Sequence, residues 1–264
     1  MKKSWFKIEN SSDDSATLHI YDEISCYGVT AADFTSELKA ITAGTINLRI
    51  NSPGGDVFDG ITIYNALKSH SAKVHVQVDG LAASIASIIA MSGDSINMAK
   101  NSFLMVHFAW ALTAGNAEEL RKLAGTLDKI DGTLVKTYQE RTGDSEQDIR
   151  NMMAAETWLT ADEALGKGFC DTVGDSAEIK ARFDLGKFKN TPQAVMGMNI
   201  VKPDNERDLE AVLRDAGMSK KEALAAVSSL KIEARRDSED SSELLEVKTF
   251  LKETLLKTKL NASY

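Results

Sequence analysis

Cysteine is scarce in this sequence, and its scarcity excludes two kinds of protein. Among the 264 residues only Cys26 and Cys170 are cysteines, and they lie far apart in the chain. Two such residues cannot build the disulfide framework of a small secreted protein, and their spacing matches no metal-binding motif. We therefore expect both to pack as small apolar side chains in a reducing cytoplasm.

The chain also lacks long apolar segments and an excess of positive charge. Its most apolar run, Leu81–Met91, is too short to cross a bilayer and contains two serines. The basic start, "MKKSWFKIENSSDD", is not followed by the apolar region of a signal peptide. The net charge of −8 argues against a nucleic-acid-binding surface. These absences predict a cytoplasmic protein that binds neither membranes nor nucleic acids.

Strand-like and helix-like segments alternate up to about residue 173. The segments "TINLRINSP" and "AKVHVQVDG" have strand patterns, while "DVFDGITIYNALKSH" has helical spacing of its apolar residues. Val78–Asp94 is expected to be a small-residue helix, and a long helix is expected over Ala117–Arg141. Such repeated βα units predict an α/β fold in which helices cover a mostly parallel sheet.

Composition divides the chain into three parts. Residues 1–188 carry the alternating pattern, and residues 189–206 hold two of the three prolines without periodicity, which indicates a linker. Residues 207–264 have helical patterns with 11 basic and 11 acidic residues, so the charge of −8 belongs to residues 1–206. We therefore predict a distinct helical C-terminal tail.

Ser84 and a glycine pair are the first candidates for chemistry. A serine in a small-residue helix usually bonds to a carbonyl one turn earlier, whereas a serine at a strand-to-helix turn can be a nucleophile. The turn at Asn51–Gly55, "NSPGG", is either a plain tight loop or a place where a bare backbone amide can face developing negative charge. A phosphate loop is the weaker interpretation, because the Walker lysine is missing.

His107 and Glu156 are the other candidates. Of the four histidines, three have the positions of surface or helix-end residues: His19, His70 and His75. His107 lies in the apolar segment "SFLMVHFAW", where it is either a core histidine or a general base with a pKa near neutrality. Glu156 lies in a mostly uncharged stretch and needs a partner if it is buried.

Four segments together resemble one known family. They occur in order between about Ile20 and Val173, and they read "INSPGGDVFDGITIYNAL", "VDGLAASIASIIAMSGD", "NSFLMVHFAW" and "ETWLTADEALGKGFCDTV". Their order and spacing resemble those of the Clp protease proteolytic subunits. The residues of these segments resemble even more closely those of the Clp-like head maturation proteases of tailed phages and prophages. The segment "LEAVLRDAGMSKKEA" in the tail also resembles this branch.

This resemblance implies a Clp/crotonase-like fold of repeated β-β-α units and a serine endopeptidase that works through an acyl-enzyme. Ser84 matches the nucleophile and His107 the base. Glu156 matches the position of the acid, which is aspartate in the cellular family. The amides of Gly55 and Ile85 match the oxyanion hole. No metal or organic cofactor is implied.

The resemblance also implies partners. These are protein or peptide substrates, further copies of the chain in a ring, and either phage capsid and scaffold proteins or a Clp-type ATPase. The helix over Ala117–Arg141 matches the handle that joins two rings, and the tail is expected to be a docking or targeting segment. One departure is Phe108-Ala109, where the cellular proteases have Gln-Pro, so the substrate groove is expected to differ.

Two other interpretations are also compatible with the sequence. A crotonase-like acyl-CoA enzyme also uses glycine-turn amides as an oxyanion hole, but it does not need Ser84, His107 and Glu156 together. A non-catalytic Clp-like subunit would only build a ring, and the intact set of candidate residues argues against it.

Overall fold

The computed structural model describes part of the chain. The described residues are 6–10, 14–24, 30–175, 183, 185–192 and 224. The chain divides into two compact units, Met1–Asn199 and Ile200–Tyr264, and the division falls inside the linker expected over residues 189–206. Cys26 and, apart from Leu224, the tail expected over residues 207–264 lie outside the described residues.

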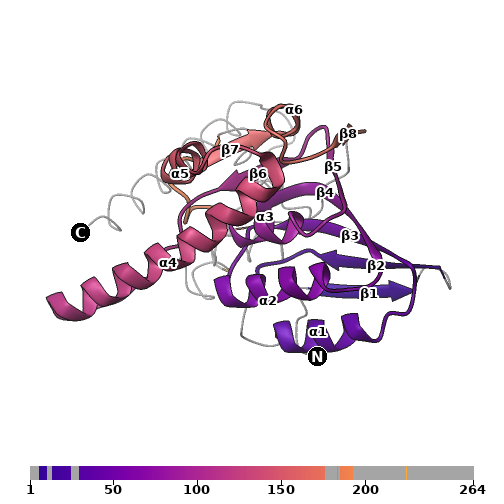
Figure 1. Ribbon diagram of the computed structural model, residues 1–264, viewed down its shortest axis with the longest axis horizontal. Helices are drawn as coiled ribbons and strands as arrows, with labels where there is room; N and C mark the ends of the chain where they lie inside the picture. The colour runs from indigo at the N-terminus through magenta and orange to yellow at the C-terminus, as the bar shows by residue number, and fades with distance from the viewer. Residues whose placement is uncertain are drawn as a thin grey trace, which may run out of the picture. The chain divides into compact units, whose positions relative to one another are not determined.

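The first unit alternates strands and helices, as the sequence pattern predicted (Figure 1). Its elements are β1 (Phe6–Asn10), β2 (Ser15–Ile20), α1 (Ala31–Lys39), β3 (Thr45–Ser52), α2 (Val57–Lys68), β4 (Lys73–Ala83), α3 (Ile85–Ala90), β5 (Ser95–Ala99), β6 (Phe103–Val106), α4 (Ala117–Thr142), α5 (Glu146–Ala154), β7 (Thr157–Thr160), α6 (Ala161–Gly166) and β8 (Thr172–Gly174).

Local capping explains where several helices begin. Thr30 and Asp33 form a reciprocal capping box at α1, and Thr160 and Glu163 form another at α6. In each box the two residues satisfy backbone N–H groups that the first turn of a helix leaves without partners. The two residues of each box are only three positions apart, so the sequence itself contains the signal for these helix starts.

The strands form one mostly parallel sheet, which confirms the predicted fold class. The order is β1-β2-β3-β4-β5-β8, with β6 paired to β4 and β7 paired to β6. Among the described strands, only β1 with β2 and β6 with β7 are antiparallel. The long strand β4 pairs with β5 along His75–Val78 and with β6 along Leu81–Ala83. The sheet therefore forks at β4, and the carboxyl ends of β4 and β6 come to lie side by side.

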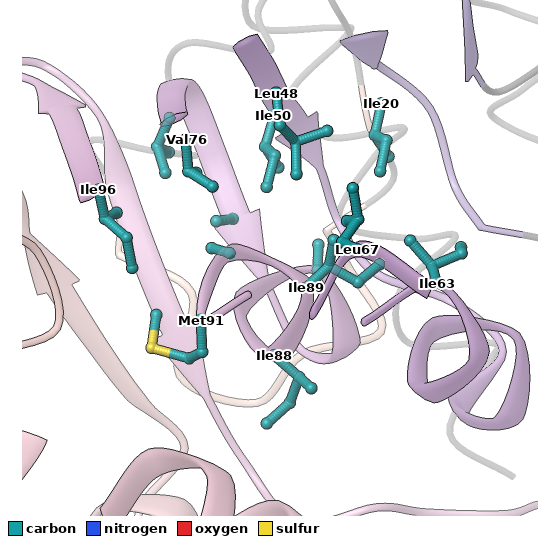
Figure 2. Close-up of a cluster of buried hydrophobic side chains, with 14 of the residues drawn as sticks. Ile20, Leu48, Ile50, Ile63, Leu67, Val76, Ile88, Ile89, Met91 and Ile96 are labelled. Carbon is teal, nitrogen blue, oxygen red and sulfur yellow. The ribbon is translucent and has the colours of Figure 1, made fainter. Parts of the chain in front are cut away.

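Helices α2 and α3 bury their apolar residues against one face of the sheet. Figure 2 shows Leu67 of α2 and Ile89 of α3 on the side that faces the strands, whereas Ile88 of α3 points away from them. The labelled members are Ile20, Leu48, Ile50, Ile63, Leu67, Val76, Ile88, Ile89, Met91 and Ile96, and each is at most 4% exposed. This close packing fixes the position of the short α3, at whose start Ser84 lies.

The expectation of a helix over Val78–Asp94 was wrong. Strand β4 continues to Ala83, and α3 covers only Ile85–Ala90. The strand is prolonged because Ala82 pairs with Ser52 of β3 and Leu81–Ala83 pairs with β6. Pairing on both sides outweighs the helical preference of a segment rich in alanine.

Helix α4 is long, and its two halves have different surroundings. It begins at a capping box formed by Asn116 and Glu119 and ends before Gly143, whose φ of 78° is in the left-handed region. The buried residues of α4 all lie in its second half: Asp131, Leu134, Val135 and Tyr138. The first half extends away from the sheet (Figure 1), and Leu120 is 45% exposed. No helix in the described part of the chain is long and apolar enough to span a membrane.

Candidate active site

Ser84 lies in the turn between β4 and α3. It is the N-cap of α3 with φ of 56° and ψ of −130°, a backbone conformation that non-glycine residues rarely adopt. Its N–H donates to the carbonyl of Met105 at 3.0 Å. The pairing of β4 with β6 therefore continues up to Ser84, and the carboxyl end of β6 lies directly beside this residue.

His107 follows β6 immediately, and its Nε2 lies 2.7 Å from Oγ of Ser84. Burial lowers the pKa of His107 below 6.5, with Glu156 acting to raise it and Lys187 to lower it. The imidazole also makes an edge contact with Phe188, with ring centroids 5.6 Å apart. A neutral imidazole at this distance can accept the proton of the serine hydroxyl.

Glu156 lies near His107 and is held by a later segment. Its carboxylate accepts the backbone N–H of Lys189 at 3.0 Å and that of Asn190 at 2.6 Å, and it has a longer contact with Trp158 Nε1 at 3.4 Å. No hydrogen bond joins Glu156 to His107 among the described residues. The structure thus brings Ser84 and His107 into contact and places the Glu156 charge close enough to affect the pKa of His107.

Two close contacts of the backbone require glycine at positions 54 and 55 of the glycine turn. A Cβ on Gly54, whose φ is 89°, would lie 2.7 Å from Cβ of Ser84, and a Cβ on Gly55 would lie 1.9 Å from the carbonyl oxygen of Ile24. Ile24 holds the turn through hydrogen bonds to the carbonyl of Gly54 at 2.8 Å and from the N–H of Asp56 at 2.9 Å. Only glycine, which has no Cβ, lets the backbone of the turn pack directly against Ser84.

The two candidate oxyanion-hole amides differ in how they are presented. Ile85 is the first residue of α3, so its N–H has no carbonyl within the helix. Gly55 lines the cleft that contains Ser84. Within the part of the chain that the structure describes, neither N–H has a hydrogen-bond acceptor.

Two neighbouring clefts meet at His107. Their volumes are about 430 Å³ and 480 Å³, and both are lined by His107, Ala109, Trp110 and Lys187. Ser84 and Gly55 line only the first, while Glu156 and Asn190 line only the second. The described residues hold no group of three or more His, Cys, Asp or Glu side chains that could bind a metal ion.

A comparison with models of known protein families shows which family the chain belongs to. The Clp protease family model matches residues 2–177. The chain belongs to the Clp protease family.

Among its relatives within this family, the ATP-dependent Clp protease proteolytic subunit of Deinococcus radiodurans is 33% identical over 132 residues, which are 49% of this chain and 65% of that protein. The Streptococcus suis subunit is 31% identical over 139 residues, 51% of this chain and 71% of the relative. The Synechococcus subunit 2 is 29% identical over 138 residues, 52% of this chain and 70% of the relative. The similarity to the Deinococcus protein thus spans less than two thirds of that protein's length.

The other three histidines and Asp171 lie away from the two clefts. His75 is exposed beside Ser95, and Nδ1 of His70 accepts the N–H of Ala72. Neither they nor His19 line the two clefts. Asp171 forms an ion pair with Arg141 at 2.7 Å and accepts the N–H of Ile96 at 2.7 Å, so it ties β5 to the end of α4. Cys170 is buried, as expected for a packing residue.

Sequence reasoning did not identify the residues that hold Glu156 and the backbone next to His107 in place. Lys189 and Asn190 hold the Glu156 carboxylate through backbone amides, which every residue except proline possesses, so no sequence signal could reveal this contact. The side chain of Asn190 also donates to the carbonyl of Ala155 at 2.8 Å. Asp131 did leave a signal, because it lies one turn before Leu134 on the apolar face of a helix. Its carboxylate accepts the N–H of Ala109 at 2.8 Å, just beyond His107.

Proposed function

We propose that the chain is a serine endopeptidase in which Ser84 is the nucleophile and His107 the general base. The observation that carries this proposal is the 2.7 Å contact between Ser84 Oγ and His107 Nε2 at the wall of a cleft. Ser84 Oγ bonds to the peptide carbonyl carbon while its proton passes to His107, which then protonates the leaving amine. A water molecule, deprotonated by His107, hydrolyses the acyl-enzyme in the second half of the reaction.

Glu156 is proposed as the acid of the triad. Its negative charge raises the pKa of His107 against the effect of burial, which stabilises the imidazolium formed during attack. The amides of Lys189 and Asn190 hold the carboxylate in place. Glutamate is one methylene longer than the aspartate that the cellular family has at the matching position, so its carboxylate must approach His107 differently.

The amides of Gly55 and Ile85 are proposed to bind the oxyanion. Both N–H groups lack an acceptor among the described residues, and the glycine turn lies directly against Ser84. Each such donor contributes on the order of 3 kcal/mol to stabilising the tetrahedral intermediate. The exposed side chain of Trp110, which lines both clefts, is suited to contact an apolar side chain of a protein substrate.

A serine-directed fluorophosphonate tests this proposal. The hydroxyl of Ser84 should displace fluoride, and mass spectrometry of the digested protein should find the adduct on the peptide containing Ser84. Ser92→Ala provides the control, because Ser92 is a buried serine that lies outside both clefts and has no partner for its Oγ in the described residues. Absence of labelling would favour the non-catalytic subunit or the acyl-CoA enzyme.

The biological role we propose is phage or prophage head maturation, by cleavage of a scaffold or capsid precursor in the bacterial cytoplasm. This role is supported by the resemblance of the segments around Ser84 and Glu156, and of the segment "LEAVLRDAGMSKKEA", to the phage branch of the family. The names of the relatives support the alternative, a proteolytic subunit that works with an ATPase. Neighbouring portal and capsid genes, with cleavage of their capsid precursor without ATP, would favour head maturation. Degradation of a folded protein only with a Clp-type ATPase and ATP would favour the alternative.

Assembly into a homo-oligomeric ring is part of the same proposal. The first half of α4 has an apolar stripe, Leu120, Leu123 and Leu127, that lies outside the buried core of the first unit. Leu120 is exposed and Leu123 and Leu127 are half-buried, and such a partly exposed stripe on a long helix is suited to pack against another subunit. A ring would also enclose the cleft and limit access to it.

A further inference from the structure

A buried hydrogen-bond chain connects α4 to the backbone of Ser84. Ser87 Oγ lies 2.5 Å from the carbonyl oxygen of Ser84, and the hydroxyl of Tyr138 lies 2.7 Å from Ser87 Oγ. A carbonyl only accepts, so the single proton of Ser87 is committed to Ser84, and Tyr138 must donate to Ser87. Burial also raises the pKa of Tyr138, which keeps its hydroxyl protonated as a donor.

This chain acts where the backbone is strained. The positive φ of Ser84 is costly for a residue with a side chain, and such a conformation persists only where surrounding contacts hold it. The N–H of Ser84 is held by Met105, and its carbonyl is held by both the N–H and the hydroxyl of Ser87. Ser87 is fully buried and Tyr138 is 1% exposed, so water cannot replace either hydroxyl.

The same helix also holds the backbone beyond His107. Asp131 accepts the N–H of Ala109 and is 7% exposed. Asp131 and Tyr138 are seven residues apart, about two helical turns, and therefore lie on the same face of α4. One helix face thus bonds to both turns that carry the reacting side chains.

We infer that Tyr138, through Ser87, and Asp131, through Ala109, are positioning residues that hold Ser84 and His107 in their reactive geometry. The inference rests on the proposed Ser84–His107 peptidase. The alternative is that these polar groups only satisfy one another in the core, and a double variant separates the two roles.

The test compares Ser87→Ala, Tyr138→Phe and the double variant in the full-length chain. Ser87→Ala leaves the buried tyrosine hydroxyl without its partner and should lower stability. The double variant removes both polar groups and should recover much of that stability. If the chain positions Ser84, the rate constant for fluorophosphonate labelling and kcat should stay about 10- to 100-fold low in the double variant, with KM little changed. Recovery of wild-type labelling together with stability would overturn the inference.

A second set of variants tests the role of Asp131. The amide oxygen of Asp131→Asn can still accept the N–H of Ala109 and should keep kcat within about threefold of wild type, whereas Asp131→Leu should lose at least tenfold. Equal rates in both variants would overturn the role of Asp131. The controls are Ser92→Ala and Tyr64→Phe, which make the same chemical changes outside this chain of bonds. A wild-type protein that is not labelled at Ser84 would overturn the proposed function itself, and this inference with it.

Discussion

Ser84 Oγ lies 2.7 Å from Nε2 of His107 although the two residues are 23 positions apart in the chain. The reason is the register of two parallel strands, in which Ala83 of β4 is the partner of Met105 of β6. Parallel neighbours end at the same edge of a sheet, so the residues that follow them emerge together. The contact is therefore a direct consequence of the fork at β4.

Removal of either reacting side chain should abolish peptide cleavage. Ser84→Ala and His107→Ala should each lower kcat by at least about 10³-fold, because such groups act as a unit. Hydrolysis of a fluorogenic peptide or of casein measures the loss, and circular dichroism checks that the fold is intact. Near wild-type activity in Ser84→Ala would exclude the serine-protease mechanism.

The acid can be identified by comparing two carboxylates. Glu156→Gln should lose much of the activity, because an amide does not stabilise the imidazolium, while Glu156→Asp should retain some. Asp171→Asn should cost stability by weakening the contact with Arg141 but leave kcat nearly unchanged. A fully active Glu156→Gln together with an inactive Asp171→Asn would show that the acid has been assigned to the wrong residue.

The pH profile should depend on the charges near His107. The base must be neutral, so kcat/KM should fall as the pH drops through the pKa of His107, which burial lowers below 6.5. Lys187 lowers this pKa, so Lys187→Met should move the acidic limb to higher pH. Loss of the Glu156 charge should move the limb to lower pH. Lys189→Met is the control, because Lys189 holds Glu156 through its backbone amide; a shift as large as that of Lys187→Met would contradict the assignment.

The glycine turn should not tolerate a side chain. Gly54→Ala places a Cβ 2.7 Å from that of Ser84 at a positive φ, so it should destabilise the protein by roughly 1–3 kcal/mol and impair cleavage. Gly125→Ala is the matched control, because a Cβ there meets nothing within 4 Å in helix α4. It should stabilise by about 0.5–1 kcal/mol. Chemical denaturation measures both changes, and equal stability of the two variants would contradict the close approach.

Assembly and activity should respond differently to two truncations. Light scattering should find a homo-oligomer well above dimer size for the full chain and for chains ending after Phe188 or after Pro192. Only the chain ending after Phe188 should lose activity, because it lacks the Lys189 and Asn190 amides that hold Glu156. A monomeric full-length protein would exclude the ring, and a monomer found only after truncation would show that the tail assembles it.

Local chemistry in the sequence was sufficient to determine many of the elements. Thr30 and Thr160 carry capping boxes whose partners lie three residues away, and the apolar periods of β3 and α2 follow from burial of one face. The alternation of such segments also determined the α/β class with a mostly parallel sheet. These features depend on neighbours in the chain, so the sequence alone expresses them.

Tertiary structure decided where the strands end and what surrounds the site. The stretch from Val78 is rich in helix-forming residues, yet pairing with β3 and β6 keeps it extended to Ala83 and places Ser84 at a turn. The contacts of Glu156 with the amides of Lys189 and Asn190 join residues more than 30 positions apart. In these contacts Lys189 and Asn190 contribute only their backbone N–H groups. Long-range pairing and backbone donors leave no local pattern, and for that reason only the folded chain reveals them.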